Sequence, residues 1–403
     1  MSSILFLSQN LSPFRALWIN ELSKYYDITF YHLQEYHQSV NEKYFKNITL
    51  NKKIKVISAN KKILKWNIFD QKIIKQTEFD ICIVDGYGYF GAMYLLLSNY
   101  IPRDKLIMSL DGGFIPSAEN NYKSGGFIPK KEKYLKKILK TILLNIPNVF
   151  FSTSSDTDDF IRYYNKKSCI KIIRHRLSAL SNRDLIDIDT QIKLYDIYRN
   201  KYGINHDETI IILVGRFLKD KNYEVIFKSL KYIKNKIKIV LVGGIITKEY
   251  QLLLESLGLQ NNFKQYLSYE EINCLKYDLN FINFLTSEQL KEFYLLSDIF
   301  CMPTKHDVWG LVVLEAIAYG GLPIISSDMC LAAKSIINEG INGYIVRDNN
   351  PIIYASYIDN LIKNLGVNDY KHKLKEYNMG IIRDYVVESA TENDIKELNS
   401  IIS

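Results

Sequence analysis

The sequence predicts an α/β protein with two parallel sheets. Both halves of the chain alternate short apolar runs with helical patterns, which is typical of strands joined by crossover helices. The 403 residues are 47% hydrophobic and 24% charged, enough apolar sequence to build two cores. A polar segment, residues 178–203, separates the halves and predicts an inter-domain connection. We therefore expect domains at 1–190 and 191–379, followed by a last helical stretch within 380–403.

Short apolar runs predict the strands of each half in chain order. In the first half they are Ile4–Ser8, Ile28–Tyr31, Lys55–Ser58, Ile81–Val84, Leu106–Leu110 and Val149–Ser152. In the second half they are Thr209–Gly215, Ile237–Val242, Phe281–Phe284, Ile299–Met302 and Leu322–Ser326. The final pattern, about Asn378 to Ile402, predicts a helix.

The segment 299–327 is the most informative part of the chain. The apolar run Ile299–Met302 meets Pro303 and a polar loop. A helical pattern then begins at Gly310 and ends at Gly320-Gly321, and Pro323 leads into the next apolar run. This order predicts the strand, loop, helix and strand of a parallel βαβ unit.

Two carboxylates flank the start of this helix. Asp307 lies in the loop and Glu315 lies eight residues later in the helix. The amides of Gly310, Leu311 and Val312 open the helix, where free N–H groups and the helix dipole favour phosphate. Because carboxylates accept hydrogen bonds from hydroxyl groups, the arrangement fits a nucleotide sugar. The alternative is an ordinary βαβ unit in which Asp307 only caps the turn.

This segment resembles the E-x7-E signature of family 4 glycosyltransferases, which are retaining enzymes with the GT-B fold. The resemblance is carried by Asp307, Trp309-Gly310-Leu311, Glu315-Ala316 and Gly321-Leu322-Pro323. Asp307 stands where the family has Glu, a difference of one methylene that bears on the donor's identity. The resemblance implies that the first acid contacts the donor sugar and the second contacts the ribose.

The same resemblance implies the domain arrangement. In the GT-B fold, two Rossmann-like domains have parallel sheets that face a central cleft. Residues 1–190 would then bind the acceptor and residues 191–379 the nucleotide sugar. The C-terminal helix, 380–403, would cross back onto the first domain.

A second motif follows the strand that starts at Thr209. Gly215 ends this strand, and Arg216 and Lys221 lie in the loop after it, where α/β proteins bind ligands. An Arg can bind phosphate oxygens in bidentate fashion and a Lys adds a point charge. The segment is similar to the family's G-R-L-x-x-x-K-G, whose Arg and Lys hold the donor diphosphate. Asn222 replaces the last Gly, and Asn tolerates the left-handed conformation.

Two further positions are donor-contact candidates. Gly243-Gly244 end the next strand and permit close approach of backbone to a ligand, or they form a structural turn only. His306 precedes Asp307 and is either a donor contact or a bystander in the loop.

The acceptor candidates lie in the first half. Asp111-Gly112-Gly113 follow the strand Leu106–Leu110, and some family 4 members that build bacterial surface glycans have a similar Asp-Gly-Gly facing the cleft. Arg15 lies after the first strand, in the loop Ser8–Arg15. A purely turn-forming role of that loop is the alternative.

Charge is unevenly distributed along the chain. The net charge is +8, and residues 1–190 hold 28 Lys and Arg against 18 Asp and Glu. The segment Pro129–Leu144 predicts an amphipathic helix, with Leu135, Ile138, Leu139 and Ile142 on one face and Lys130, Lys133, Lys136, Lys137 and Lys140 on the other. Such a helix lies on anionic lipid, or its apolar face is core and the lysines are a solvated surface.

Several classes of protein and site are not indicated. No apolar window is long enough for a membrane span, and the N-terminus predicts a buried strand rather than a signal peptide. The five widely spaced cysteines fit a reducing cytoplasm. We expect no cofactor and no metal, since Asp156-Thr157-Asp158 begins a helix and the histidines lack ligand spacing. Aromatic and basic residues are not arranged for nucleic acid. The oligomeric state is not indicated.

Together with these patterns, the resemblance to family 4 implies a retaining, metal-independent hexosyltransferase. The catalytic set is Arg216, Lys221, Asp307 and Glu315, and the favoured donor is a UDP-sugar. The acceptor is expected to be lipid-linked or a growing polysaccharide of a capsule or O-antigen-like surface glycan, reached from the cytoplasm and at the inner membrane face. The alternatives are a catalytically idle partner subunit that binds glycan or membrane, and an enzyme similar to UDP-sugar 2-epimerases.

Overall fold

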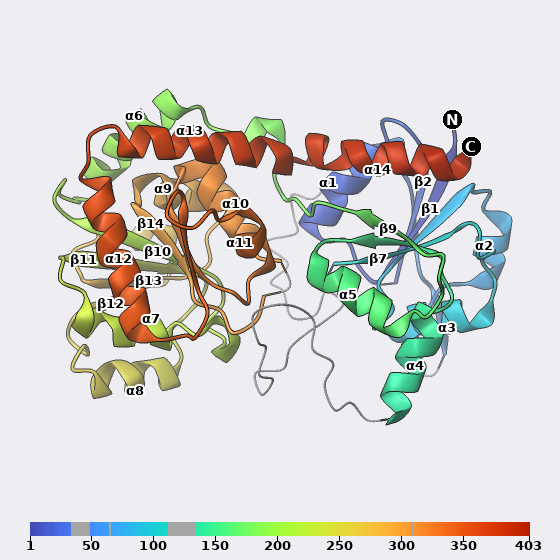
Figure 1. Ribbon diagram of the computed structural model, residues 1–403, viewed down its shortest axis with the longest axis horizontal. Coiled ribbons are helices and arrows are strands. Elements are labelled where there is room, and N and C mark those ends of the chain that lie inside the picture. Colours follow the sequence, from blue (N-terminus) through green and yellow to red (C-terminus); the bar gives the residue numbers. More distant parts are fainter. Residues whose placement is uncertain (34–48, 64–65, 112–133, 308) are drawn as a thin grey trace. The chain divides into compact units, whose positions relative to one another are not determined.

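The structure is a computed structural model that describes residues 1–33, 49–63, 66–111, 134–307 and 309–403. It divides into two compact units, shown in Figure 1. Unit 1 comprises the described residues up to Ser181 together with Tyr385–Ser403, and unit 2 comprises Asn182–Asp384. Each unit contains one seven-stranded sheet whose ladders are all parallel, so the predicted α/β class with two parallel sheets is confirmed.

The sheet of unit 1 has β1 at the third position from one edge. In spatial order its strands are β3 (Lys55–Ser58), β2 (Asp27–His32), β1 (Ser3–Ser8), β6 (Ile81–Asp85), β7 (Leu106–Leu110), β8 (Val149–Ser152) and β9 (Lys171–Arg174). The helices are α1 (Pro13–Leu22), α2 (Gln71–Gln76), α3 (Phe90–Ser98), α4 (Tyr134–Leu144), α5 (Ser155–Tyr164) and α14 (Val387–Ile402). A short antiparallel hairpin joins β4 (Lys61–Ile63) and β5 (Trp66–Ile68).

Alternation along β1 builds the two cores of unit 1. Ile4 and Phe6 pack with Trp18 of α1 on one face of the sheet, while Leu5 and Leu7 belong to the cluster on the other face. Successive side chains of a strand point to opposite faces, so a strand covered on both faces is apolar throughout. The last helix, α14, packs against α1 and β9 of the same unit (Figure 1).

The sheet of unit 2 is built in the same way. Its spatial order is β12 (Phe263–Tyr266), β13 (Leu279–Ile282), β11 (Ile237–Val242), β10 (Thr209–Val214), β14 (Ile299–Met302), β15 (Ile324–Ser327) and β16 (Gly343–Val346). The α-helices are α6 (Ile188–Lys201), α7 (Glu224–Ser229), α8 (Lys248–Ser256), α9 (Ser287–Leu296), α10 (Leu311–Glu315), α11 (Leu331–Ile336), α12 (Pro351–Leu365) and α13 (Tyr370–Ile382).

Three expectations about elements need correction. The polar segment 178–203 contains the 14-residue helix α6, which packs against α9. The strand expected at Phe281–Phe284 lies two residues earlier, as β13. The single C-terminal helical pattern is two helices, α13 and α14, separated by the 3-10 turn Arg383–Tyr385.

Candidate functional site

The carboxyl edge of the unit 2 sheet gathers the predicted donor-site residues. Gly215 follows β10 directly and Gly243 follows β11. A Cβ added at Gly243 would lie 2.3 Å from the carbonyl oxygen of Gly215, so the two turns pack backbone against backbone. Both glycines have positive φ, 147° and 144°, a conformation that favours glycine. Gly244 shares this conformation, at 140°. The turns therefore leave no room for side chains where the two strands end.

Asn222 fixes the loop that carries Arg216 and Lys221. Its φ is +54°, the left-handed conformation that was predicted for Asn222 because it replaces the last Gly of the motif. Its buried amide donates hydrogen bonds to the carbonyl oxygen of Pro303 (3.0 Å) and to Oδ1 of Asn349 (2.6 Å). The loop after β10 is thereby tied to the loop after β14, which contains Asp307.

Arg216 and Lys221 have different surroundings. Arg216 is exposed, and among the described residues its guanidinium has no hydrogen-bond or ion-pair partner. Lys221 is mostly buried, and its ammonium pairs with Oδ2 of Asp307. One predicted phosphate ligand, Arg216, therefore has no partner in the described structure, and the other, Lys221, is neutralised by Asp307 of the E-x7-E segment.

Asp307 uses its two carboxylate oxygens for two contacts. Oδ1 accepts a hydrogen bond from the backbone amide of Trp309 (3.2 Å), while Oδ2 binds Lys221. The backbone amide of Asp307 donates to the carbonyl oxygen of Met329 (3.1 Å). The interpretation of Asp307 as a turn cap thus describes one of its oxygens, and the ion pair describes the other.

The helix after this turn has the bounds that the glycines predict. Gly310, with φ +95°, is the N-cap, and a Cβ there would meet Sγ of Cys330 at 2.5 Å. Helix α10 begins at Leu311 and includes Val312, and it continues as a π-helical turn, Ala316–Gly320. Gly321 ends it in the left-handed conformation, φ +61°. A π-turn is rare and often occurs at functional sites.

Glu315 is held at the junction of α10 and the π-turn. The hydroxyl of Tyr294, a buried residue of α9, donates a hydrogen bond to Oε2 of Glu315 (3.1 Å). Burial raises the pKa of Glu315, and the Asp184 charge adds to this, while the Tyr294 bond and Lys291 oppose it. The carboxyl group is therefore oriented by Tyr294 and less acidic than an exposed glutamate.

His306 lies in the same loop, partly buried. Burial lowers the pKa of its imidazole, while the negative charges of Asp307 and Asp220 raise it by less. Its backbone is fixed by Thr304, whose hydroxyl donates to the His306 carbonyl oxygen (2.7 Å). At neutral pH the ring is accordingly uncharged and available for hydrogen bonding.

The acceptor candidates of unit 1 form a buried charge cluster. Arg15 is 1% exposed, and its Nη2 binds Oδ2 of Asp111 (2.6 Å) and Oδ1 of Asp85 (2.5 Å). Asp85 also accepts a hydrogen bond from the Ser8 hydroxyl (2.8 Å). Within the described part of the chain, the buried Oδ1 of Asp111 has no hydrogen-bond partner. The structure thus brings Arg15 and Asp111 together, whereas Gly112 and Gly113 lie outside the described residues.

Two residues of these sites escaped the sequence patterns. Asp85 ends β6 beside Asp111 at the carboxyl edge of the unit 1 sheet, and a carboxylate directly after the apolar run Ile81–Val84 was the available signal. Tyr294 had the periodicity of a core residue and is buried, but its hydroxyl also binds Glu315. No pattern distinguishes a core tyrosine with a free hydroxyl from one whose hydroxyl binds a functional group.

The Asp-Thr-Asp sequence at residues 156–158, which was not expected to bind a metal, lies at the start of a helix. Asp156 and Asp158 lie in the first turn of α5, where the sequence placed them. Asp158 binds Arg174 and accepts a hydrogen bond from the Ser152 hydroxyl (2.5 Å). In the described ranges no cluster of three or more His, Cys, Asp or Glu side chains is arranged to hold a metal ion.

Helix α4 presents its apolar face to solvent. Leu135 is 80% exposed and Ile142 is 47% exposed, with Ile138 and Leu139 above a third. Lys136 and Lys137 are exposed on the same helix, while Lys130 and Lys133 lie outside the described residues. The interpretation of this apolar face as core is therefore wrong for the described part of the helix. None of the described helices combines the length and apolarity that crossing a bilayer requires.

The second half of the chain is similar to known glycosyltransferases. Residues 195–379 match the family model described as "Glycosyl transferases group 1". This range contains every donor-site candidate from Gly215 to Glu315. The chain is 27% identical over 175 residues to an uncharacterized glycosyltransferase of Methanocaldococcus jannaschii, covering 43% of this chain and 40% of that protein. It is 24% identical over 235 residues to an uncharacterized protein in the cps region of Klebsiella pneumoniae, covering 56% and 57%. The chain spans about half the length of the curated relatives it matches.

Solved structures match over the whole chain. The structure of HepE from Anabaena in complex with UDP superposes with a TM-score of 0.70 at 15% identity, covering 99% of this chain and 100% of that one. At this identity the likeness establishes the fold, and the predicted GT-B class is confirmed. The chain thus has a GT-B-like α/β fold, and its residues 195–379 resemble the group 1 glycosyltransferase domain.

Proposed function

We propose that this protein is a retaining glycosyltransferase that moves a hexose from a nucleotide sugar, with UDP-sugars as the favoured donors. The observation that carries this proposal is the grouping of Arg216, Lys221, Asp307 and Glu315 around the loops at one edge of the unit 2 sheet. The edge offers cations for a diphosphate and carboxylates for hydroxyl groups. The structural neighbours described in complex with UDP and with UDP-glucose support the choice of base.

The proposed donor contacts follow from the surroundings of each group. Arg216, which has no partner in the described structure, binds the diphosphate in bidentate fashion. Lys221 and the amides of Gly310, Leu311 and Val312 add positive potential where the leaving group gains charge. Glu315, oriented by Tyr294, accepts hydrogen bonds from the ribose hydroxyls. Asp307 and His306 contact the sugar.

The proposed reaction needs no protein nucleophile. The bond between the anomeric carbon and the phosphate oxygen breaks, and the acceptor oxygen bonds to the same face of that carbon. The acceptor's proton passes to the departing phosphate oxygen. The protein supplies orientation and preorganised positive charge. No metal takes part in this scheme. We therefore expect the transfer rate to be the same with and without a chelator.

The acceptor contacts are proposed for unit 1. Asp111 accepts a hydrogen bond from a hydroxyl of the acceptor glycan through its unpartnered Oδ1. Arg15 acts through Asp111, because its guanidinium is buried and holds that carboxylate together with Asp85. Gly112 and Gly113, which lie outside the described residues, are proposed as further acceptor contacts.

We propose a lipid-linked or polysaccharide acceptor of surface-glycan biosynthesis, met at an anionic membrane face in the cytoplasm. The basic balance of residues 1–190 and the exposed apolar face of α4 support this location. The relative in a cps region and the neighbour WaaG, described as involved in lipopolysaccharide biosynthesis, agree with such a role.

The catalytically idle alternative retains one observation in its favour. Asp307 replaces the family's Glu and already neutralises Lys221. Incubation of the purified protein with UDP-glucose, UDP-galactose and their N-acetylated forms distinguishes the possibilities. We expect UDP release with one of these donors, and an α-linked product by NMR when a sugar acceptor is supplied. Binding without turnover would favour the idle subunit, and formation of the 2-epimer would favour an epimerase.

A further inference from the structure

A second cavity lies at the opposite edge of the unit 2 sheet. It has a volume of about 420 Å³, within the range of small-molecule sites. Asp298 and Pro323, which line it, immediately precede β14 and β15, so the cavity is at the amino ends of these strands. The donor candidates follow the carboxyl ends. The cavity is therefore separate from the donor site and has no part in the proposed reaction.

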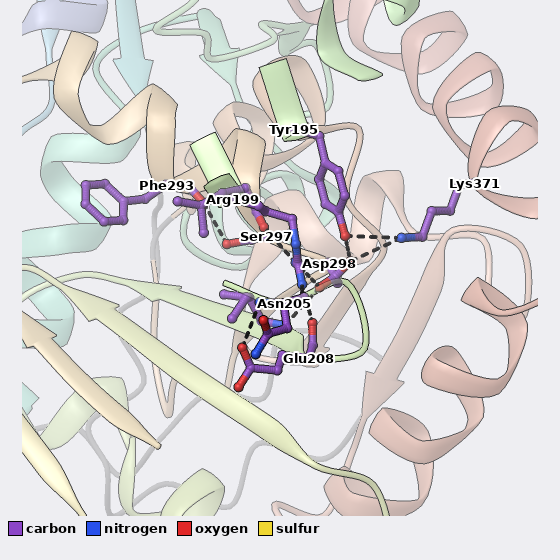
Figure 2. A network of polar contacts seen from close by, with 10 residues as sticks. Tyr195, Arg199, Asn205, Glu208, Phe293, Ser297, Asp298 and Lys371 are labelled. Atoms are coloured by element: carbon purple, nitrogen blue, oxygen red, sulfur yellow. Dashed lines mark hydrogen bonds and ion pairs between the residues drawn. The ribbon is translucent and has the colours of Figure 1, made fainter. Parts of the chain in front are cut away.

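Helix α13 supplies two lysines to this cavity. Lys371 and Lys375 are one helical turn apart and lie on the same face. The ammonium of Lys371 is 3.3 Å from Oδ1 of Asp298 and 3.3 Å from the hydroxyl of Tyr195 (Figure 2). The ammonium of Lys375 donates to the carbonyl oxygen of Gly320 and to Oε1 of Gln191 (3.1 Å).

The carboxylate of Asp298 is already matched by another cation. Arg199, fully buried, binds its Oδ2 at 3.0 Å, and Figure 2 shows the two side chains meeting below Tyr195. The backbone amide of Ile210 donates to the same oxygen (2.9 Å). One arginine thus neutralises the one acid at the base of the cavity. Lys371 and Lys375 add positive charge beyond this pair.

The remaining acids do not compensate for the lysines. Asp196 and Asp369, the other acidic residues that line the cavity, are exposed at its rim. Among the described residues, the partners of the Lys375 ammonium are the neutral oxygens of Gln191 and Gly320. Burial lowers the pKa of Lys375 to about 8, and the Lys371 charge adds to this while Asp298 opposes it. A buried ammonium without a counter-ion is stabilised by any anion that reaches it.

The walls of the cavity are apolar. Ile192 of α6, Leu322 before β15, and Leu365 and Leu374 from the region of α12 and α13 line it. We propose that this cavity is a second small-molecule site, whose ligand places a phosphate or carboxylate between Lys371 and Lys375 and an apolar body against these walls. Lys375 also holds Gly320, the last residue of the helical segment that carries Glu315. A ligand in the cavity would therefore lie at the Gly320 end of this helical segment, whereas the donor candidates lie at its Gly310 end.

The first test measures binding of phenyl phosphate to the whole protein by calorimetry. We expect it to bind roughly tenfold more tightly than inorganic phosphate, because the ring adds apolar contact. A comparison with benzoate distinguishes phosphate from carboxylate ligands. Lys371→Met should weaken the binding roughly tenfold through loss of one charge-assisted contact. Lys373→Met, on the same helix but exposed and outside the cavity, is the matched control and should bind as the wild type does.

A second measurement locates the ligand without a variant. The aldehyde of pyridoxal 5′-phosphate condenses with a neutral lysine amine, releasing water, and borohydride reduces the imine to a stable secondary amine. Peptide mapping should find Lys375 labelled ahead of exposed Lys373, with protection by phenyl phosphate and none by UDP. The proposal is overturned if UDP displaces phenyl phosphate, if Lys371→Met binds it unchanged, or if Lys375 is labelled no faster than Lys373.

Discussion

The ammonium of Lys221 pairs with the carboxylate of Asp307 across 86 residues of sequence. The pair joins the loop after β10 to the loop after β14, and both side chains are mostly buried. Without a ligand, the positive charge of Lys221 is therefore matched by Asp307, whereas Arg216 is exposed and unmatched in the described structure. A diphosphate would then bind Arg216 freely and share Lys221 with Asp307.

Replacement of Arg216 or Lys221 by Met should each reduce the transfer rate by about 10² to 10³, because one preorganised electrostatic contact to the leaving group is lost. Initial rates with the best UDP-sugar measure this. Lys219→Met is the matched control, since Lys219 is an exposed cation of the same loop. Equal rates of the Arg216 and Lys219 variants would remove Arg216 from the site.

Asp307→Asn tests the two contacts of this residue separately. The amide oxygen of Asn still accepts the Trp309 hydrogen bond, so the turn is kept, but the charge that matches Lys221 is lost. We expect UDP to bind several-fold more tightly while transfer falls about tenfold or more, because Lys221 is released and the sugar contact is weakened. Calorimetry and initial rates give the two numbers. Weaker UDP binding in this variant would contradict the assigned role of the ion pair.

The central strands of both sheets were predictable because both faces of each are buried. Runs such as Ile299–Met302 are apolar throughout and have clear ends. The edge strands β9, β12 and β16 were not predicted, because polar residues or a glycine interrupt each of them, whereas the edge strand β3 was predicted at its observed bounds. Helix α6 was missed for another reason. Its buried residues are Gln191 and Arg199, which are polar and whose partners include the remote residues Ala318 and Asp298. A search for hydrophobic periodicity does not detect a helix that is buried through polar residues.

In the candidate site, the positions of the residues were predictable from the sequence, but the contacts between them were not. Local motifs predict the positions of Arg216, Lys221, Asp307 and Glu315 because each depends on a strand end or a helix start. The Lys221–Asp307 pair, the Tyr294–Glu315 hydrogen bond and the Arg15 contacts with Asp85 and Asp111 depend on tertiary proximity. A single sequence contains no signal for which of its distant polar residues meet.

The raised pKa of Glu315 predicts how donor binding changes with pH. Burial raises the pKa of the Glu315 carboxyl above its ordinary value of 4.5. On acidification Glu315 therefore takes up a proton at a higher pH than an exposed glutamate does. The acceptor oxygens for ribose are then lost, and the Kd of UDP-glucose should rise as the pH is lowered from neutral towards 4.5. UDP-glucose has no phosphate monoester, so its own charge is constant in this range.

Glu315→Gln provides the comparison for that pH profile. It should bind UDP-glucose roughly tenfold more weakly at neutral pH, since a charge-assisted hydrogen bond becomes a neutral one. Its Kd should also change less with pH than that of the wild type. If both proteins show the same pH profile, another group causes the effect.

Asp85→Asn should stabilise unit 1 at neutral pH. Burial raises the pKa of Asp85 to about 6, and the Asp111 charge adds to this, while Arg15, the Ser8 hydrogen bond and His175 oppose it. Because the folded-state pKa lies above the ordinary value of 3.8, the folded state binds the proton more tightly than the unfolded state. Stability from this group is therefore complete below about pH 4 and is lost as the pH rises towards 6 and above.

The variant removes that loss and leaves Arg15 paired with Asp111. We expect the free energy of unfolding at pH 7 to increase by about 1–2 kcal/mol, with little difference near pH 4. Urea unfolding at both values measures this. Asp104 is an exposed acid of the same unit, so Asp104→Asn is the control and should leave the free energy of unfolding unchanged at both pH values. A loss of stability at pH 7 would mean that the attraction to Arg15 outweighs the burial of the second carboxylate.

Helix α4 should bring the protein to anionic membranes, because it combines an exposed apolar face with exposed lysines. Attraction is worth about 1 kcal/mol per Lys near an anionic leaflet and is screened by salt, whereas burial of apolar area is not. Cosedimentation with vesicles that contain phosphatidylserine should therefore decrease as salt rises. Lys136→Glu with Lys137→Glu should weaken binding mainly at low salt, and Leu135→Ser with Ile142→Ser should weaken it at every salt concentration.

Lys52→Glu with Lys53→Glu is the matched control for the charge variant. These exposed lysines belong to the same unit and give the same change in net charge away from α4. Equal losses in the two charge variants would mean that net charge, rather than α4, determines attachment. Release of UDP from a soluble donor should be unchanged in all of them, since the donor candidates belong to unit 2. Wild-type protein that ignores anionic vesicles at low salt would exclude a membrane role for α4 and favour a soluble acceptor.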